Sequence, residues 1–188
     1  MKPTLSDWNG IKRVFRYLKG TKGLGIIYQS NNKSLKIYSD ADYANDVETR
    51  RSQTGMVAVL SGGAIAWLSQ LQKSVATSTM HAETKAACEG AKLSRWLVLL
   101  LSELQREKQP APTLYIDNMS AVKIAKNPEG HQRSKQFEVE DFYVRELVAE
   151  GKLIVQHIPG AEQPADIFTK ALARVKFQKF RKDIGILN

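Results

Sequence analysis

The sequence predicts an α/β fold in which helices cover a mixed, five-stranded β-sheet. Two strand-like runs, 54–60 and 64–70, are joined by a Ser-Gly-Gly turn at 61–63, which is typical of a β-hairpin. A long amphipathic helix pattern over 78–105 follows, and strand and helix patterns then alternate to the end of the chain. This order predicts three antiparallel strands continued by parallel strands.

The first half of the chain is predicted to begin with a short helix over 7–18 and a strand-like run over 23–29. Three sheet strands over 34–40, 54–60 and 64–70 and the long helix over 78–105 would follow. Ser6 or Asp7 would cap the first helix, and Gly20 would end it. The sequence does not show how residues 22–29 join the sheet.

The second half is predicted to contain strands over 113–117 and 152–158 and helices over 118–128 and 139–151. A closing helix would begin beside Asp166. The segment QPAP at 109–112 would break the long helix before the first of these strands, and Gly151 would end the last complete helix. Pro164 stands at a position that favours the first turn of the closing helix.

Two carboxylates are predicted at the ends of neighbouring strands. Asp40 closes the strand 34–40 and Asp117 closes the strand 113–117, each in a Tyr-x-Asp string. Parallel neighbours would deliver both acids to one edge of the sheet, where open α/β sheets keep their ligand sites. Asp42 shares the face of Asp40, so a shift in the strand end would make Asp42 the ligand instead; the strand pattern favours Asp40.

Two further carboxylates come from predicted helices. Glu83 lies in the first turn after the cap Ser78 or Thr79 and belongs to the apolar stripe of that helix. An unpaired anion turned toward a core costs several kcal/mol by rough estimate, so Glu83 needs a cation or a metal. Asp166 follows Pro164 at a helix start. Each acid alone could be a cap or a surface charge, but all four together predict a metal site.

Basic residues gather at the two ends of the chain. Residues 1–33 hold seven Lys and Arg against one Asp, and residues 169–188 hold six against one Asp. The net charge is +9, so the residues between them are slightly acidic. Basic ends around an acidic centre suit a polyanion held by its phosphates, although solvated helix faces would look the same. The candidate phosphate-binding residues are Lys176, Lys179, Arg181 and Lys182.

Composition excludes several classes of protein. The chain of 188 residues is 43% hydrophobic and 25% charged, which is ordinary for one compact domain. Its apolar runs are too short to span a bilayer, and its start does not resemble a signal peptide, so we expect no membrane partner and an intracellular protein. The single cysteine, Cys88, and three scattered histidines lack the spacing of a zinc site.

The strings around the acids carry a resemblance. They are RYLKGT, YSDADYANDVETRRSQTG, STMHAE, YIDNMSAVKIAKNP, HQRSK and PADIFTK, in that order. Over nearly the whole chain the sequence resembles the ribonuclease H region of copia-type retrotransposon polyproteins. The resemblance implies a ribonuclease H-like domain over 34–188, preceded by a basic, connection-like segment over 1–33. His81 and Gln136 stand where family members commonly have an acid and a histidine.

The resemblance also implies a chemistry. It makes Asp40, Glu83, Asp117 and Asp166 the catalytic ligands of two Mg²⁺ or Mn²⁺ ions that cut the RNA strand of an RNA/DNA hybrid, leaving 5′-phosphate and 3′-hydroxyl ends. The implied partners are the hybrid and the reverse transcriptase part of the same polyprotein, in a cytoplasmic virus-like particle or in the nucleus. Two alternatives stay open: a catalytically inactive or host-adopted nucleic-acid-binding module, and a transposase- or integrase-like nuclease. The short sequence separation between Asp40 and Glu83 disfavours the transposase- or integrase-like nuclease.

Four more residues are candidates for contact with the hybrid or the reaction. Asn118, beside the predicted ligand Asp117, would contact a 2′-hydroxyl group, which distinguishes RNA from DNA. Arg133 and Lys135 would contact the hybrid backbone. His157 lies nine residues before Asp166 but at a strand end, which favours a structural role over a catalytic one.

Overall fold

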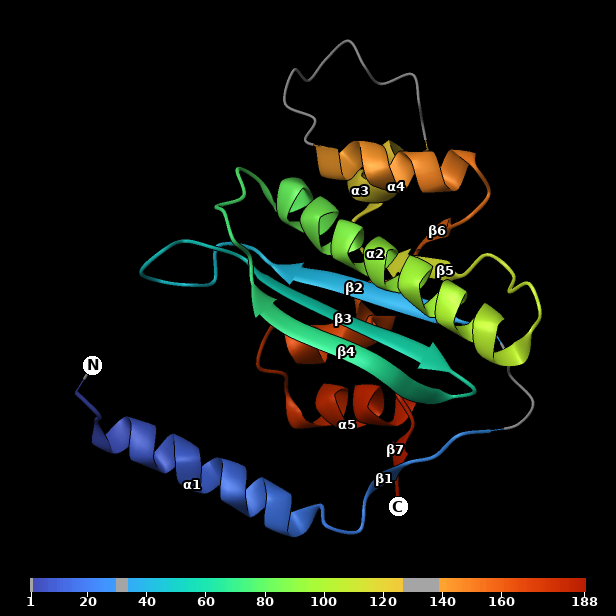
Figure 1. Cartoon of the computed structure of the whole chain (residues 1–188). Coiled ribbons are helices and arrows are strands. Elements are labelled where there is room, and N and C mark those ends of the chain that lie inside the picture. Colours follow the sequence, from blue (N-terminus) through green and yellow to red (C-terminus); the bar gives the residue numbers. More distant parts are fainter. Residues whose placement is uncertain (1, 30–33, 127–138) are drawn as a thin grey trace.

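A mixed five-stranded β-sheet forms the centre of the molecule (Figure 1). The computed structural model describes residues 2–29, 34–126 and 139–188. The sheet order is β4-β3-β2-β5-β6, and the strands are β2 (Lys36–Asp42), β3 (Gln53–Leu60), β4 (Gly63–Leu71), β5 (Thr113–Ile116) and β6 (Ile154–His157). Strands β2, β3 and β4 are antiparallel, whereas β5 is parallel to β2 and β6 to β5. This topology confirms the predicted fold class.

Helices cover both faces of the sheet. The helices of the described ranges are α1 (Leu5–Gly20), α2 (Thr79–Gln105), α3 (Met119–Lys126), α4 (Val139–Ala149) and α5 (Arg174–Asp183), with the short 3-10 helices η2 (Gly160–Glu162) and η3 (Pro164–Phe168). Helix α1 has no buried residue and does not cover the sheet (Figure 1). Helix α2 packs across β2 and β3 on one face, with α3 and α4 on the same side, while η3 and α5 lie on the opposite face (Figure 1).

Alternate residues of the sheet strands pack into two hydrophobic cores, one on each face of the sheet. Ile37 and Leu114 are fully buried against α2, whereas Val57 and Val59 pack on the opposite side with Ile184. Strand β3 is therefore buried on both faces along most of its length. The hairpin between β3 and β4 has the predicted turn, since Ser61 and Gly62 both have positive φ, as a type I′ hairpin turn requires.

The closing segment differs from the prediction. Asp166 lies in η3, a short 3-10 helix, and the last helix, α5, begins only at Arg174. Pro164 does occupy the first turn of η3, as predicted. Among the helices of the described ranges, none is both long enough and apolar enough to cross a membrane.

The N-terminal segment lies beside the C-terminus rather than in the main sheet. Strand β1 (Gly25–Ile26) pairs antiparallel with β7 (Ile186–Leu187) in a separate two-stranded sheet, which answers how residues 22–29 are held. Helix α1 is capped by Thr4 and not by Ser6 or Asp7, because Asp7 supplies the other half of a capping box. The helix ends at Gly20, as predicted.

Candidate metal centre

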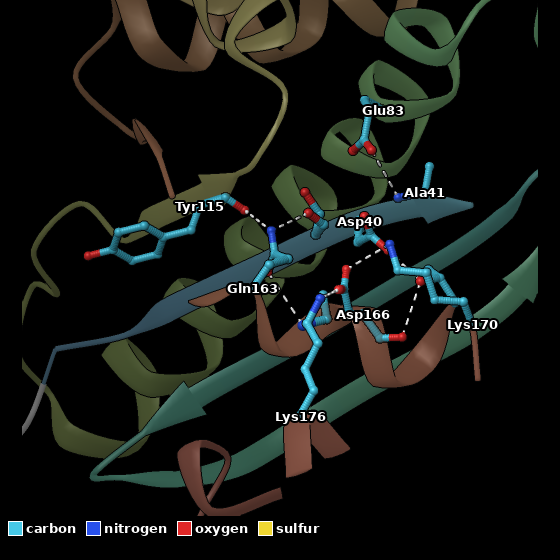
Figure 2. Close-up of polar contacts among 11 residues, drawn as sticks. Asp40, Ala41, Glu83, Tyr115, Gln163, Asp166, Lys170 and Lys176 are labelled. Atoms are coloured by element: carbon cyan, nitrogen blue, oxygen red, sulfur yellow. Dashed lines mark hydrogen bonds and ion pairs between the residues drawn. The ribbon is translucent and has the colours of Figure 1, made fainter. Parts of the chain in front are cut away.

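Four acidic side chains from four elements meet at one edge of the sheet. Asp40 comes from β2, Glu83 from α2, Asp117 from the residue after β5 and Asp166 from η3. One carboxylate oxygen from each of Asp40, Glu83 and Asp117 lies within 4.8 Å of the others. Asp166 lies next to this group, and Lys170 bridges it to Asp40 (Figure 2). We call these four residues the acid cluster. Their role as metal ligands stays a prediction.

The parallel pairing of β2 and β5 places two of the acids together. Tyr38 is the register partner of Tyr115, and their rings stack with centroids 5.0 Å apart. Asp40 follows Tyr38 by two residues and Asp117 follows Tyr115 by two residues, so both carboxylates lie at the same edge of the sheet. Strand β2 continues beyond Asp40 to Asp42, which is half-buried at its end. The group of three acids that could hold a metal contains Asp40 and not Asp42, within the described part of the chain.

Hydrogen bonds at the start of α2 position Glu83. The side chain of Ser78 caps the helix by accepting from the backbone N–H of His81 at 3.1 Å. The side-chain amide of Gln72 donates to the carbonyl of Ala82 at 3.0 Å and thereby ties the first turn of α2 to the end of β4. Glu83 therefore points at the sheet edge from a fixed helix end.

Glu83 is buried, and no ion pair joins it to a lysine or arginine of the described residues. One of its oxygens accepts from the backbone N–H of Ala41 at 3.4 Å, and the other, Oε2, is buried with no hydrogen-bond partner among the described residues. Burial, followed by the nearby charges of Asp40 and Asp117, raises the pKa of Glu83 to about 9. A buried carboxylate oxygen without a partner, facing two more carboxylates, fits a divalent cation.

The pKa values of Asp40 and Asp117 are raised as well. Burial, together with the charges of Asp166 and Asp117, raises the pKa of Asp40 to about 6, although the hydroxyl of Thr169 and the charge of Lys170 act to lower it. Burial, and then the charge of Asp166, also raises the pKa of Asp117. The cluster therefore carries more negative charge than its surroundings neutralise, and added positive charge would stabilise it.

Asp166 is positioned by the close approach of η3 to the sheet. A Cβ atom on Gly55 of β3 would lie 2.8 Å from the carbonyl oxygen of Ala165, so this approach requires glycine. Gln163 is fully buried, and its side-chain amide donates to the carbonyl of Ser39 at 2.9 Å (Figure 2). Gln163 thus holds the segment before Asp166 against β2.

Sequence reasoning missed the residues that surround Asp40 and Asp166. The hydroxyl of Thr169 donates to Asp40 Oδ2. Lys170 Nζ lies 3.0 Å from Asp166 Oδ1 and 3.4 Å from Asp40 Oδ2. Lys176, whose role in phosphate binding stays a prediction, donates to Asp166 Oδ2. The signal for Lys170 was present, because a lysine four residues after an acid in a helical turn can reach it.

Two further candidates have structural contacts. The Asn118 side-chain oxygen accepts from the backbone N–H groups of Ser120 and Ala121, at 3.0 and 3.1 Å, and so caps α3. Nε2 of His157 lies 3.1 Å from the backbone carbonyl oxygen of Asp117, at the end of β6. His157 is therefore placed to steady the strand end that carries Asp117.

The remaining basic candidates are spread over the C-terminal region. Lys179 donates to the carbonyl of Ala161 at 2.6 Å, and Lys182 is exposed. Arg133 and Lys135 lie outside the described residues. A groove of about 680 Å³ between α1 and α5, which also contains Tyr17 and Phe177, is lined by four arginines, Arg13, Arg16, Arg174 and Arg181.

The sequence is similar to segments of retrotransposon polyproteins. It is 40% identical over 184 residues to the retrovirus-related Pol polyprotein from transposon TNT 1-94 of Nicotiana tabacum, covering 98% of this chain and 14% of that protein. It is 38% identical over 186 residues to the Pol polyprotein from transposon RE2 of Arabidopsis thaliana, covering 98% of this chain and 13% of that one. The chain thus spans about one seventh of the length of these relatives. No family model matches.

The fold is similar to solved ribonuclease H structures. The N-terminal RNase H domain of a Mycobacterium tuberculosis protein matches 78% of this chain and 98% of its own, with a TM-score of 0.51 and 14% identity. RNase H1 from Halobacterium salinarum matches 72% of this chain and 94% of its own, with a TM-score of 0.51 and 17% identity. At these identities the likeness concerns the fold.

Proposed function

The chain is a ribonuclease H domain of the copia-type retrotransposon Pol polyprotein family, and from this premise we propose that it hydrolyses the RNA strand of RNA/DNA hybrids with two bound Mg²⁺ or Mn²⁺ ions. The observation that carries the proposal is the acid cluster. Three carboxylates within 4.8 Å of one another, with an unpartnered buried oxygen on Glu83, suit divalent cations better than any neutral ligand.

The acids would divide between the two ions. Asp40, Glu83 and Asp117 would hold one ion, and Asp40 with Asp166 the other. When bound, such ions activate a water and stabilise the leaving 3′-oxygen, which leaves 5′-phosphate and 3′-hydroxyl ends. The protein fixes the ligand geometry, since Thr169 orients Asp40 and the adjacent segments are tied to the sheet. Asn118, next to Asp117, would contact the 2′-hydroxyl group that marks the RNA strand.

A cleavage assay tests this function. We expect the chain to cut the RNA of a labelled RNA/DNA hybrid in Mg²⁺, to leave duplex DNA intact and to stop in chelator. Asp117→Asn should abolish cleavage but leave hybrid affinity unchanged or raised, because it removes a ligand and also removes negative charge near the phosphates. Asp42→Asn is the matched control and should have a much milder effect.

The opposite outcomes separate the alternatives. Cleavage that persists in chelator would contradict the metal-dependent mechanism. Hybrid binding without cleavage in Mg²⁺ or Mn²⁺ would support an inactive or host-adopted nucleic-acid-binding module instead. An active Asp42→Asn variant beside an inactive Asp40→Asn variant is expected, and the reverse pattern would move the metal site along β2.

We also propose that the domain works beside the reverse transcriptase part of a longer polyprotein, in a virus-like particle or in the nucleus. The relatives extend far beyond the matched segment, and residues 1–33 would connect the catalytic domain, 34–188, to that part. Helix α1 supports this role, because each of its residues is at least partly exposed, including Trp8, Phe15 and Leu18. Such an apolar helix face is typical of a protein interface.

A further inference from the structure

Two lysines already place positive charge on one side of the acid cluster. Lys170 Nζ lies between Asp40 and Asp166, at 3.4 and 3.0 Å, and Lys176 donates to the other oxygen of Asp166 (Figure 2). The side chain of Asp166 is 2% exposed, whereas those of Lys170 and Lys176 are 37% and 36% exposed. The acid is fixed and buried, but both ammonium groups are carried on stems open to solvent.

The charge compensation of the cluster is therefore asymmetric. Asp166 has two ammonium partners, while Glu83 has an oxygen with no hydrogen-bond partner among the described residues. A buried carboxylate is stable only with a compensating charge or hydrogen bonds. Asp40 and Asp166 form ion pairs with the protein's own lysines, whereas Glu83 and Asp117 form none among the described residues.

We propose that Lys170 and Lys176 are tethered counter-cations that hold the Asp166 side of the cluster together without metal, and that a metal ion can bind between Asp40 and Asp166 only by displacing the Lys170 ammonium group. This inference rests on the proposed function and specifies how its site is loaded. The ion held by Asp40, Glu83 and Asp117 binds first, because no ammonium group contacts Glu83 or Asp117 in the described residues. The second ion binds more weakly, because it competes with Lys170.

Metal titration of the full chain tests the competition. Mn²⁺ binding, counted by calorimetry and by electron paramagnetic resonance, should resolve a tighter and a weaker site in the unmodified protein. Lys170→Gln should strengthen the weaker site by about tenfold or more, because it removes a positive charge from the position of the ion. Lys170→Arg keeps the charge and should leave the weaker site weak. Lys152→Gln, which removes a lysine from an exposed ion pair with Glu150, is the matched control.

Thermal unfolding supplies a second readout. In chelator, Lys170→Gln and Lys176→Gln should each lower the melting temperature, because Asp166 loses a partner. Saturating Mn²⁺ should narrow the difference between Lys170→Gln and the unmodified protein. Circular dichroism before each titration establishes that the variants are folded, and Lys170→Arg covers the case in which Lys170→Gln does not fold.

The possible results separate a failure of the Lys170 competition from a failure of the proposed metal-dependent function. A weaker site that is unchanged or lost in Lys170→Gln would overturn the competition while leaving the metal centre in place. A Lys170→Arg variant that binds the second ion as tightly as Lys170→Gln would overturn the role of charge. Absence of Mn²⁺ binding in every form would overturn the inference together with the proposed metal-dependent function.

Discussion

At the scale of single residues, burial sets the chemistry of the acid cluster. The pKa of Glu83 is raised from 4.5 to about 9 and that of Asp40 from 3.8 to about 6, in both cases first by burial. A group whose pKa rises on folding binds its proton more tightly in the folded state. Its contribution to stability is therefore largest below the unfolded pKa and declines as the pH rises toward the folded pKa. For Glu83 this window spans neutral pH.

We therefore expect the metal-free protein to lose stability as the pH rises through this window, and Glu83→Gln to remove much of the loss. Glutamine keeps the shape of the side chain but has no proton to release. The free energy of unfolding, measured by denaturant titration in chelator between about pH 5 and pH 8, checks this. Glu107→Gln, at an exposed acid, is the control and should follow the unmodified protein. Parallel curves for Glu83→Gln and the unmodified protein would contradict the prediction.

At the scale of elements, local pattern predicted most of the sheet and α2, but not the path of the chain around Asp166. Helical spacing of Ile167, Phe168 and Leu172 predicted one closing helix. The structure has a 3-10 turn there, and the side chains of Thr169 and Lys170 contact Asp40 of the sheet. We attribute the break in the helix to these contacts. Such tertiary contacts link residues more than a hundred positions apart and leave no periodic signal.

The packing of η3 on β3 gives a prediction at this scale. A Cβ at Gly55 would lie 2.6 Å from Thr169 Cγ2 and 2.8 Å from the Ala165 carbonyl oxygen, and backbone cannot yield cheaply. Gly55→Ala should push η3 away, destabilise the protein by roughly 1–3 kcal/mol and reduce cleavage, because Asp166 moves with η3. Gly10→Ala is the matched control, since nothing lies within 4 Å of a Cβ there. Denaturant unfolding and the cleavage assay measure both effects, and a fully stable, active Gly55→Ala variant would refute the argument.

At the scale of the whole molecule, the N-terminal segment that follows α1 pairs with the C-terminal strand. Strand β1 pairs with β7 (Figure 1). The ring of Tyr17 in α1 meets that of Phe177 in α5 edge to face, with centroids 5.8 Å apart. Composition alone showed that both ends are basic, and the register of a two-residue strand pair carries too little pattern to be read from sequence. Folding therefore converts two separate basic segments into one arginine-lined groove.

This groove gives the last prediction. Arg13 and Arg16 of α1 face it together with Arg174 and Arg181, whereas Lys176 and Lys179 are engaged by protein oxygens. If the groove holds phosphates of the hybrid, Arg13→Gln/Arg16→Gln should weaken hybrid binding and flatten the dependence of log affinity on log salt by roughly one unit per lost phosphate contact, since fewer counterions are released.

Binding of a labelled hybrid across a salt series measures this slope, and Lys108→Gln/Lys152→Gln removes the same charge from lysines that do not line the groove. We expect that control to keep both the affinity and the slope nearly unchanged, and cleavage at saturating hybrid to survive in both double variants, because neither touches the acid cluster. Equal losses in the two double variants would mean that attraction depends on net charge alone. An unchanged slope for Arg13→Gln/Arg16→Gln would place the hybrid elsewhere and leave the α1 side of the groove facing the rest of the polyprotein.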